Sequence, residues 1–171
     1  PNTTDQIDLV TMASVGNATD FGNLTASMKE VQSTSSPTRG IMGGGNTVPA
    51  TINTIQFITI ASTGNASDFG DLTRTASSLG AVSSGTRGVF ANGGSNTIDF
   101  VTIASTGNAT DFGDSTLLRA QCTATMSNSI RGVFAGGYQP SPNSTDTNIV
   151  DFITIATTGN ASDFGGISRL K

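Results

Sequence analysis

Short runs of apolar and β-branched residues recur along the chain, and they lack the spacing that marks an amphipathic helix. The clearest run covers 98–104. Alternation along this run puts Ile98 and Phe100 on one face and Val101 and Ile103 on the other. Because both faces are largely apolar, the run predicts a β-strand that is covered on both sides.

A turn signal follows each of these strands. After 98–104 it is the pair Gly107 and Asn108, which precedes a second short strand through Phe112. Glycine and asparagine both tolerate positive φ angles, so the pair predicts a tight hairpin turn at its position. Gly113 is expected to end the second strand.

The pattern occurs four times, and each copy carries the motif Gly-Asn-Ala-Ser/Thr-Asp-Phe-Gly, with the copies 48, 43 and 52 residues apart. A second repeated motif is Arg-Gly followed by an apolar pair and glycines. All nine Phe residues lie on these motifs or on the long strand, which predicts that the core itself is repeated. The residues with an expected structural role in the repeat are Phe21, Phe69, Phe112 and Phe164, Asp20, Asp68, Asp111 and Asp163, and Arg39, Arg87 and Arg131.

Each repeat offers about four short strands in roughly 45 residues, which is typical of one antiparallel blade of a β-propeller. The predicted fold class is therefore all-β, a β-propeller-like array, and the alternative is a β-solenoid. A single repeat domain is expected over 1–171, with a half repeat at 1–25, repeats at 26–73 and 74–116, and a last repeat with the start of the next at 117–171. The chain is expected to be a piece of a longer protein and not to close a ring by itself.

The repeat also resembles the blade of a kelch propeller, in which a basic residue precedes the first strand, a double glycine ends the second and a large aromatic lies between later strands. Arg74, the pair Gly93 and Gly94, and Phe112 occupy these places. The sequence of residues 98–114 is in addition similar to repeats in large virion proteins of tailed phages, especially aquatic ones. These resemblances imply a propeller fold and a structural or receptor-contacting part of a virion.

Composition and charge exclude several classes of protein. Only 35% of the 171 residues are hydrophobic, no apolar run is long enough to cross a membrane, and a net charge of −4 is unfavourable for a nucleic-acid partner. The single cysteine, Cys122, excludes a disulfide scaffold, and the absence of His removes the usual base of serine and cysteine hydrolases. We therefore expect no catalytic residue, no cofactor and no metal, and we expect Cys122 to be a packed thiol.

Two groups of recurring polar residues have a functional as well as a structural interpretation. Asp68 and Asp71 have the spacing of paired carboxylates, which serve calcium binding or glycoside hydrolysis. Because the first Asp recurs in every copy, we favour a role in capping a turn or pairing with an Arg of the second motif. The Asn of each Gly-Asn pair begins an Asn-x-Ser/Thr sequon, and so do Asn2, Asn23 and Asn143. These sequons fit a glycosylated secreted protein, but the turn by itself explains the Asn, and we favour that explanation.

Nearly all variation in repeat length lies between the double glycine and the long strand, which is the place of a surface loop. The longest of these segments begins at the only tyrosine of the chain. Tyrosine favours interfaces because it combines a rigid apolar ring with a polar tip. The alternative is a tolerated insertion without a partner. The candidate residues for a partner or ligand are Tyr138, Gln139, Pro140, Asn143 and Asp146.

These observations together predict a non-enzymatic structural or attachment component of a phage-like virion, such as a tail fibre or baseplate part. Its expected partners are other virion subunits or further repeats of the same chain, together with a host-surface glycan. The alternative is a secreted or cell-surface repeat adhesin or filament subunit. In both cases the chain is expected to work within an oligomeric assembly.

Overall fold

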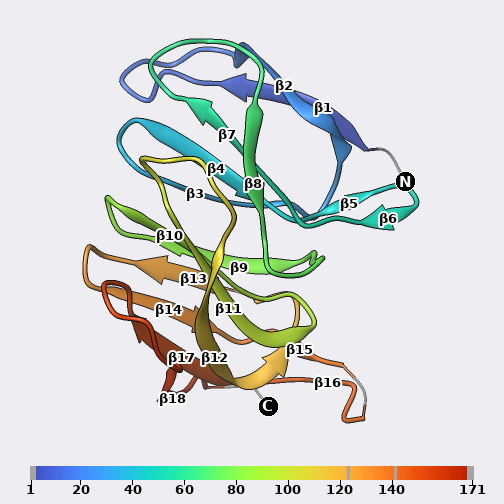
Figure 1. Ribbon diagram of the computed structural model, residues 1–171, viewed down its shortest axis with the longest axis vertical. Helices are drawn as coiled ribbons and strands as arrows, with labels where there is room; N and C mark the ends of the chain where they lie inside the picture. The colour runs from blue at the N-terminus through green and yellow to red at the C-terminus, as the bar shows by residue number, and fades with distance from the viewer. Residues whose placement is uncertain (1–2, 123, 141, 169–171) are drawn as a thin grey trace.

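The computed structural model describes residues 3–122, 124–140 and 142–168, and all regular elements within them are β-strands (Figure 1). The expected all-β fold class is therefore confirmed. The strands form small antiparallel sheets that follow one another along the chain. Consecutive stretches of the sequence thus build consecutive sheets.

Three of these sheets contain four strands that pair in chain order, and we call them the first, second and third full sheets. The first consists of β3 (Gln32–Ser35), β4 (Arg39–Gly43), β7 (Thr54–Thr59) and β8 (Ser67–Asp71). The second consists of β9 (Leu79–Ser83), β10 (Arg87–Asn92), β11 (Ser95–Thr102) and β12 (Thr110–Arg119). The third consists of β13 (Ala124–Ser127), β14 (Arg131–Ala135), β17 (Ile149–Thr154) and β18 (Ser162–Gly166).

A two-stranded sheet, called here the half sheet, precedes the full sheets and consists of β1 (Thr4–Leu9) and β2 (Thr19–Met28). It corresponds to the last two strands of a full sheet. Two short hairpins are inserted between the second and third strands of the first and third full sheets. They are β5 (Asn46–Thr47) with β6 (Ala50–Thr51), and β15 (Tyr138–Gln139) with β16 (Thr145–Asp146).

Each Asp-Phe-Gly triplet forms a β-bulge at the same place in its sheet. On β11 and β12, Ile98 pairs with Gly113 and the next residue, Asp99, pairs with Asp111, so that Phe112 has no partner in the ladder. The pairs β1–β2, β7–β8 and β17–β18 show the same shift. The extra residue of a bulge bends the strand and redirects a side chain. Gly113 therefore does not end a strand, contrary to the expectation from sequence, and β12 continues to Arg119.

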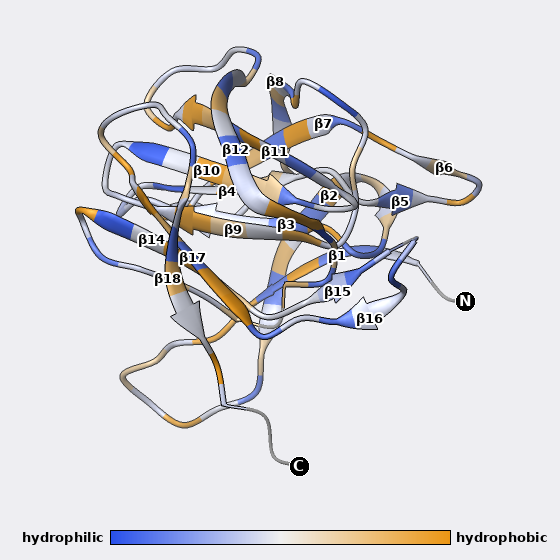
Figure 2. Ribbon diagram, turned by 90° about the horizontal axis from the view of Figure 1, so that it is seen from below, coloured by the Kyte–Doolittle hydropathy of each residue, from blue (hydrophilic) through white to orange (hydrophobic). Residues whose placement is uncertain are grey.

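The sheets lie on one another, with the half sheet at one end of the molecule and the third full sheet at the other (Figure 1). The first strands of the full sheets, β3, β9 and β13, are neighbours. Apolar stretches on β9, β10 and β17 give the interior its hydrophobic character (Figure 2). The apolar side chains that pack between consecutive full sheets include Ile41, Ile55, Val101 and Ile103 between the first and second, and Val89, Ile98, Ile153 and Ile155 between the second and third.

The Phe residues occupy this interior as their repeat positions predict, with one exception. Phe21, Phe69, Phe90, Phe112 and Phe134 are buried. Phe57, Phe100 and Phe152 are half-buried, and each packs edge-to-face against the bulge Phe of its own sheet at a centroid distance of 5.8 to 5.9 Å. The exception is Phe164, which is 62% exposed because none of the described residues forms a sheet that covers it.

Candidate interaction surfaces

In the second, third and fourth copies of the repeat motif, the Gly-Asn-Ala part binds the sheet that precedes it in the stack. The backbone amides of Gly107 and Ala109 donate hydrogen bonds to the carbonyl oxygens of Phe69 and Asp71, at 2.7 and 2.8 Å. In return, the amide of Asp71 donates to Oδ1 of Asn108 at 3.1 Å. We call this arrangement the clasp. Two further clasps with the same atoms join residues 64–66 to 21–23 and residues 159–161 to 112–114.

The clasp requires glycine in the Asp-Phe-Gly bulge. Gly70 has a φ of +144°, and a Cβ added there would lie 2.5 Å from the carbonyl oxygen of Gly107. Gly22 and Gly113 are crowded in the same way, by Gly64 and Gly159. The first half of one motif copy therefore fits against the second half of the copy before it.

This geometry corrects the interpretation of the Gly-Asn pair as a two-residue hairpin turn. Gly107 and Asn108 do lie in the connection between β11 and β12, as expected. The chain reverses earlier, however, where the amide of Ser105 donates to the carbonyl of Thr102. Gly107 and Asn108 follow this turn and lie along the neighbouring sheet, to which they are hydrogen-bonded.

Two Arg residues of the second motif, Arg39 and Arg87, also reach the next sheet, but they do so without the expected Asp partners. Arg39 lies over the ring of Phe57 at 4.6 Å and donates to the carbonyl oxygen of Ile103 at 3.0 Å. Arg87 lies over Phe100 and donates to Ile155 in the same manner. Arg131 lies over Phe152 at 4.7 Å. The positive charge is therefore held by an aromatic face and a carbonyl.

The expected pairs of these Arg residues with Asp20, Asp68, Asp111 and Asp163 are wrong for the described residues. The ion pairs found there are Lys29 with Glu30, and Arg119 with Asp151. The four Asp side chains are exposed. The position that carries Asp71 contributes only its backbone amide and carbonyl to the clasp, which explains why the repeat tolerates Asn, Asp or Gly there.

Sequence reasoning missed the buried polar cluster around Arg119 and Asp151. Both side chains are fully buried, with Nη2 of Arg119 2.7 Å from Oδ2 of Asp151. Arg119 also donates to the carbonyl oxygens of Ile149 and Phe134, at 3.2 Å each, and Thr116 donates to Asp151 at 2.5 Å. The signal available in the sequence was an acidic or amide residue in the same apolar strand of every repeat.

In the second full sheet the same position is occupied by Asp99, which lies 4% exposed between sheets. The hydroxyl and the amide of Thr73 donate to its carboxylate, at 2.7 and 3.1 Å. Burial raises the pKa of Asp99, and the negative charge of Asp111 adds to this, whereas the Thr73 bonds and the charge of Arg74 lower it. Arg74 is itself bonded to the carbonyl oxygen of Asn92, in the turn between β10 and β11.

The candidate loop forms the β15–β16 hairpin. Tyr138 exchanges two backbone hydrogen bonds of 2.8 Å with Ala120, in the connection that leads to the third full sheet. Asn46 of the β5–β6 hairpin exchanges the same bonds with Lys29. Both hairpins extend from the same side of the stack (Figure 1), and β15 and β16 are largely hydrophilic (Figure 2).

Within this hairpin the candidate residues differ in exposure. Tyr138, Gln139 and Pro140 are half-buried, whereas Asn143 and Asp146 are exposed. The hairpin is therefore fixed at its base and offers polar groups at its tip. Asn2, at the start of the chain, lies outside the described residues.

The other candidates occupy packed or solvated positions. Cys122 is half-buried, its sulfur accepts a hydrogen bond from Nδ2 of Asn92 at 3.1 Å, and burial raises the pKa of its thiol. The described residues contain no group of three or more His, Cys, Asp or Glu that could hold a metal ion. Asn65, Asn108 and Asn160 serve the clasps with their side-chain oxygens.

Comparison of the sequence with models of known protein families finds no match, and neither does a search of curated proteins. In the described part of the chain, no helix has the length and apolar character needed to cross a membrane.

Proposed function

We propose that the chain is a segment of a β-propeller that serves as a non-enzymatic structural or attachment part of a phage-like virion. Its partners would be other virion subunits or further repeats of the same chain, and a glycan on the host surface. The repeat motifs support this proposal because they act between sheets. A module whose repeated residues all hold consecutive sheets together is suited to a rigid scaffold.

The observation that carries the proposal is the clasp. It occurs three times with the same donor and acceptor atoms, and its bulge glycines, Gly22, Gly70 and Gly113, leave no space for a Cβ. In a propeller, each blade of four antiparallel strands packs its faces on its two neighbours. The second full sheet is packed in this way, with one apolar cluster on each face.

The β15–β16 hairpin is the proposed attachment site. It is anchored to the sheet connection through Tyr138 and Ala120, and its tip carries the exposed side chain of Asn143. Loops that a rigid scaffold holds in place are common sites of recognition. Hydroxyl, amide and carboxylate groups of this kind bind sugars or polar protein surfaces.

A second function has one observation in its favour. Asn143 begins a sequon, is exposed and takes no part in a clasp, so its amide is accessible to a glycan. A secreted or cell-surface adhesin would carry such a glycan. The two functions differ in where the protein is found and in the mass of the peptide that contains Asn143.

The test replaces the hairpin and measures attachment. In one variant, residues 138–147 are exchanged for residues 95–97, which take their place after the double glycine of the second full sheet, and the control variant carries Val48→Ala at the tip of the β5–β6 hairpin. We expect both to keep the circular dichroism and the melting temperature of the parent chain, and only the exchange to abolish virion incorporation or host adsorption. Normal incorporation and normal adsorption of the exchanged variant would contradict the proposal. Recovery of the protein from cell surfaces instead of particles, with a glycan on Asn143, would favour the adhesin.

A further inference from the structure

The two ends of the stack carry the two unused halves of a clasp. Gly16, Asn17 and Ala18 repeat the half that binds a preceding sheet, and the described residues form no sheet before the half sheet. Phe164, Gly165 and Gly166 repeat the half that receives the next sheet. A Cβ added at Gly165 would have no atom within 4 Å, in contrast to its crowded counterparts in the three formed clasps, Gly22, Gly70 and Gly113.

We propose that these halves join between molecules, so that the half sheet of one copy docks on the third full sheet of a second copy, head to tail. The inference goes beyond the proposed function and does not depend on it. The three internal clasps define the expected contacts. The amides of Gly16 and Ala18 would donate to the carbonyl oxygens of Phe164 and Gly166 of the second copy, and the amide of that Gly166 would donate to Oδ1 of Asn17.

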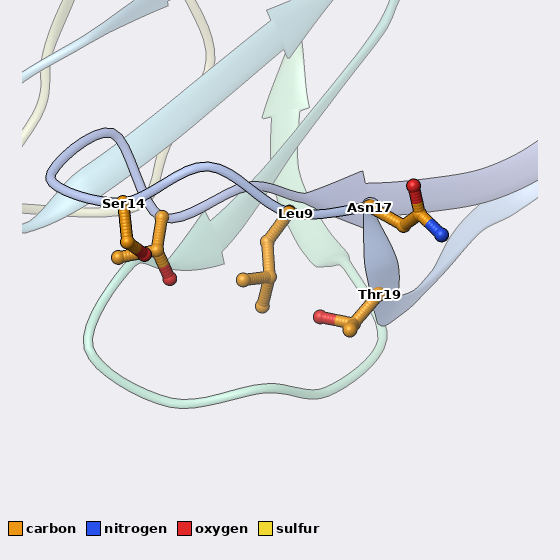
Figure 3. A pocket seen from close by; sticks show the side chains of 6 residues that line it. Leu9, Ser14, Asn17 and Thr19 are labelled. Carbon is orange, nitrogen blue, oxygen red and sulfur yellow. The ribbon is translucent and has the colours of Figure 1, made fainter.

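A hollow lies beside the first motif copy, as it does beside two copies that form clasps. It is lined by Leu9, Thr11, Ser14, Gly16, Asn17 and Thr19. In Figure 3 the amide of Asn17 points away from the side chain of Leu9. Asn108 and Asn160, at the same repeat position, lie in equivalent hollows and hold their clasps.

The apolar side chains at the two ends support the same contact. Val10 and Met12 are 61% and 98% exposed, although Val101 and Ile103, at the same repeat positions in the second full sheet, are 3% and 1% exposed. At the other end Phe164 is 62% exposed, whereas Phe112 is 3% exposed. The residues that pack between sheets elsewhere in the stack are thus left open at both ends. Apolar side chains grouped in this way mark an interaction surface.

The cation at the receiving end also lacks the acceptor that its counterparts have. Arg39 and Arg87 donate to the carbonyl oxygens of Ile103 and Ile155 in the next sheet. Arg131 keeps the stacked position over Phe152, and the equivalent acceptor would be the carbonyl oxygen of Met12 in the second copy. One docked pair therefore completes the clasp, the apolar packing and the Arg contact at once. A head-to-tail contact of this type builds either a closed ring or an open filament.

The experiment measures the mass of the purified 171-residue chain by sedimentation velocity over a wide concentration range. We expect concentration-dependent assembly. Met12→Asp should raise its midpoint concentration at least about tenfold, because a buried unpaired charge disfavours contact, and Asn17→Ala should raise it about fivefold, the effect of one hydrogen bond. Ala61→Asp, the same charge on an exposed loop of the first full sheet, is the control and should leave the midpoint unchanged. All variants should melt at the temperature of the parent chain under conditions where they are monomers.

A monomer at every concentration would overturn the inference and would leave further repeats of a longer polypeptide as the cover of both ends. Assembly that is equally strong in the parent chain, Met12→Asp and Asn17→Ala would also overturn it, since the contact would then lie elsewhere. Neither result bears on host adsorption, so failure of this inference is distinct from failure of the proposed function.

Discussion

At the scale of single residues, the repeat motif is explained by contacts with the next copy of itself. Glycine at the bulge leaves space for a backbone carbonyl of the next copy. The side-chain oxygen of Asn accepts a hydrogen bond from a backbone amide of the preceding sheet. Sequence reasoning recognised the motif and expected these residues to shape a local turn. The partner of these residues could not be found from the sequence. Both halves of the clasp belong to the same short motif, and nothing in the motif shows that its first half binds the second half of another copy.

The matched glycines Gly70 and Gly165 test the steric part of this explanation. Both have positive φ angles, +144° and +130°, so an alanine at either position is strained by roughly 1–3 kcal/mol. Only at Gly70 would the new Cβ also meet a carbonyl oxygen, at 2.5 Å. We expect Gly70→Ala to lower the free energy of unfolding in urea by clearly more than Gly165→Ala, measured where the chain is monomeric. Equal decreases in the free energy of unfolding for the two variants would show that the clasp accommodates the added Cβ at Gly70 without a loss of stability.

The buried Asp99 predicts a pH dependence of stability. Its pKa in the folded chain is raised above the ordinary value of 3.8, so that the folded state holds its proton more tightly than the unfolded state. The contribution of this group is therefore most favourable below pH 3.8 and is lost as the pH rises through the folded-state pKa. Asp99→Asn removes the ionisable group and with it the loss of stability at higher pH. Gln56 occupies the same place in the first full sheet, which shows that the site accepts a side-chain amide. We expect the variant to gain stability relative to the parent chain between pH 4 and 7, measured by urea unfolding; a difference that does not change with pH would contradict this.

At the scale of elements, the four strands of each full sheet could be predicted, but the inserted hairpins and the register and length of the strands could not. Alternation of apolar residues along 98–104 predicted the long strand, and β11 covers most of it. The bulge at Phe112 was not predicted, because it depends on how β12 pairs with β11. For the same reason Gly113 was taken for the end of a strand, although it allows the strand to continue past the bulge.

The bulge Phe is expected to be the main apolar anchor of each sheet on the next. Phe112 is 3% exposed and packs in the cluster between the second and third full sheets, whereas Phe164 occupies the same bulge without a following sheet. We expect Phe112→Ala to lower the free energy of unfolding by about 3–5 kcal/mol, as for a large core truncation. Phe164→Ala is the control and should cost less than about 1 kcal/mol in the monomer, since most of the ring is already in water. Denaturant unfolding of both variants checks this, and losses of similar size would show that the position in the stack does not matter.

At the scale of the whole molecule, the chain is a series of sheets in which each packs on its neighbours in sequence. The repeats predicted this order, and the contacts between β3, β9 and β13 follow it. The hairpin residues Tyr138 to Asp146 were predicted as a surface loop from the change in repeat length alone. Which partner they bind cannot be predicted from such a pattern, because length variation marks where a loop is tolerated and not what it recognises.

A stack of this kind should unfold from its ends. The second full sheet is covered on both faces, while the half sheet and the third full sheet are each covered on one. In an array stabilised by contacts between neighbours, a terminal unit loses only one interface when it opens, and the central unit loses two. We therefore expect hydrogen exchange of the monomer, followed by mass spectrometry, to be slowest in β10 and faster in β1, β2 and β18. Uniform protection across the chain would mean that the sheets unfold as one cooperative unit, and faster exchange in β10 than in β18 would mean that coverage by neighbouring sheets does not set local stability.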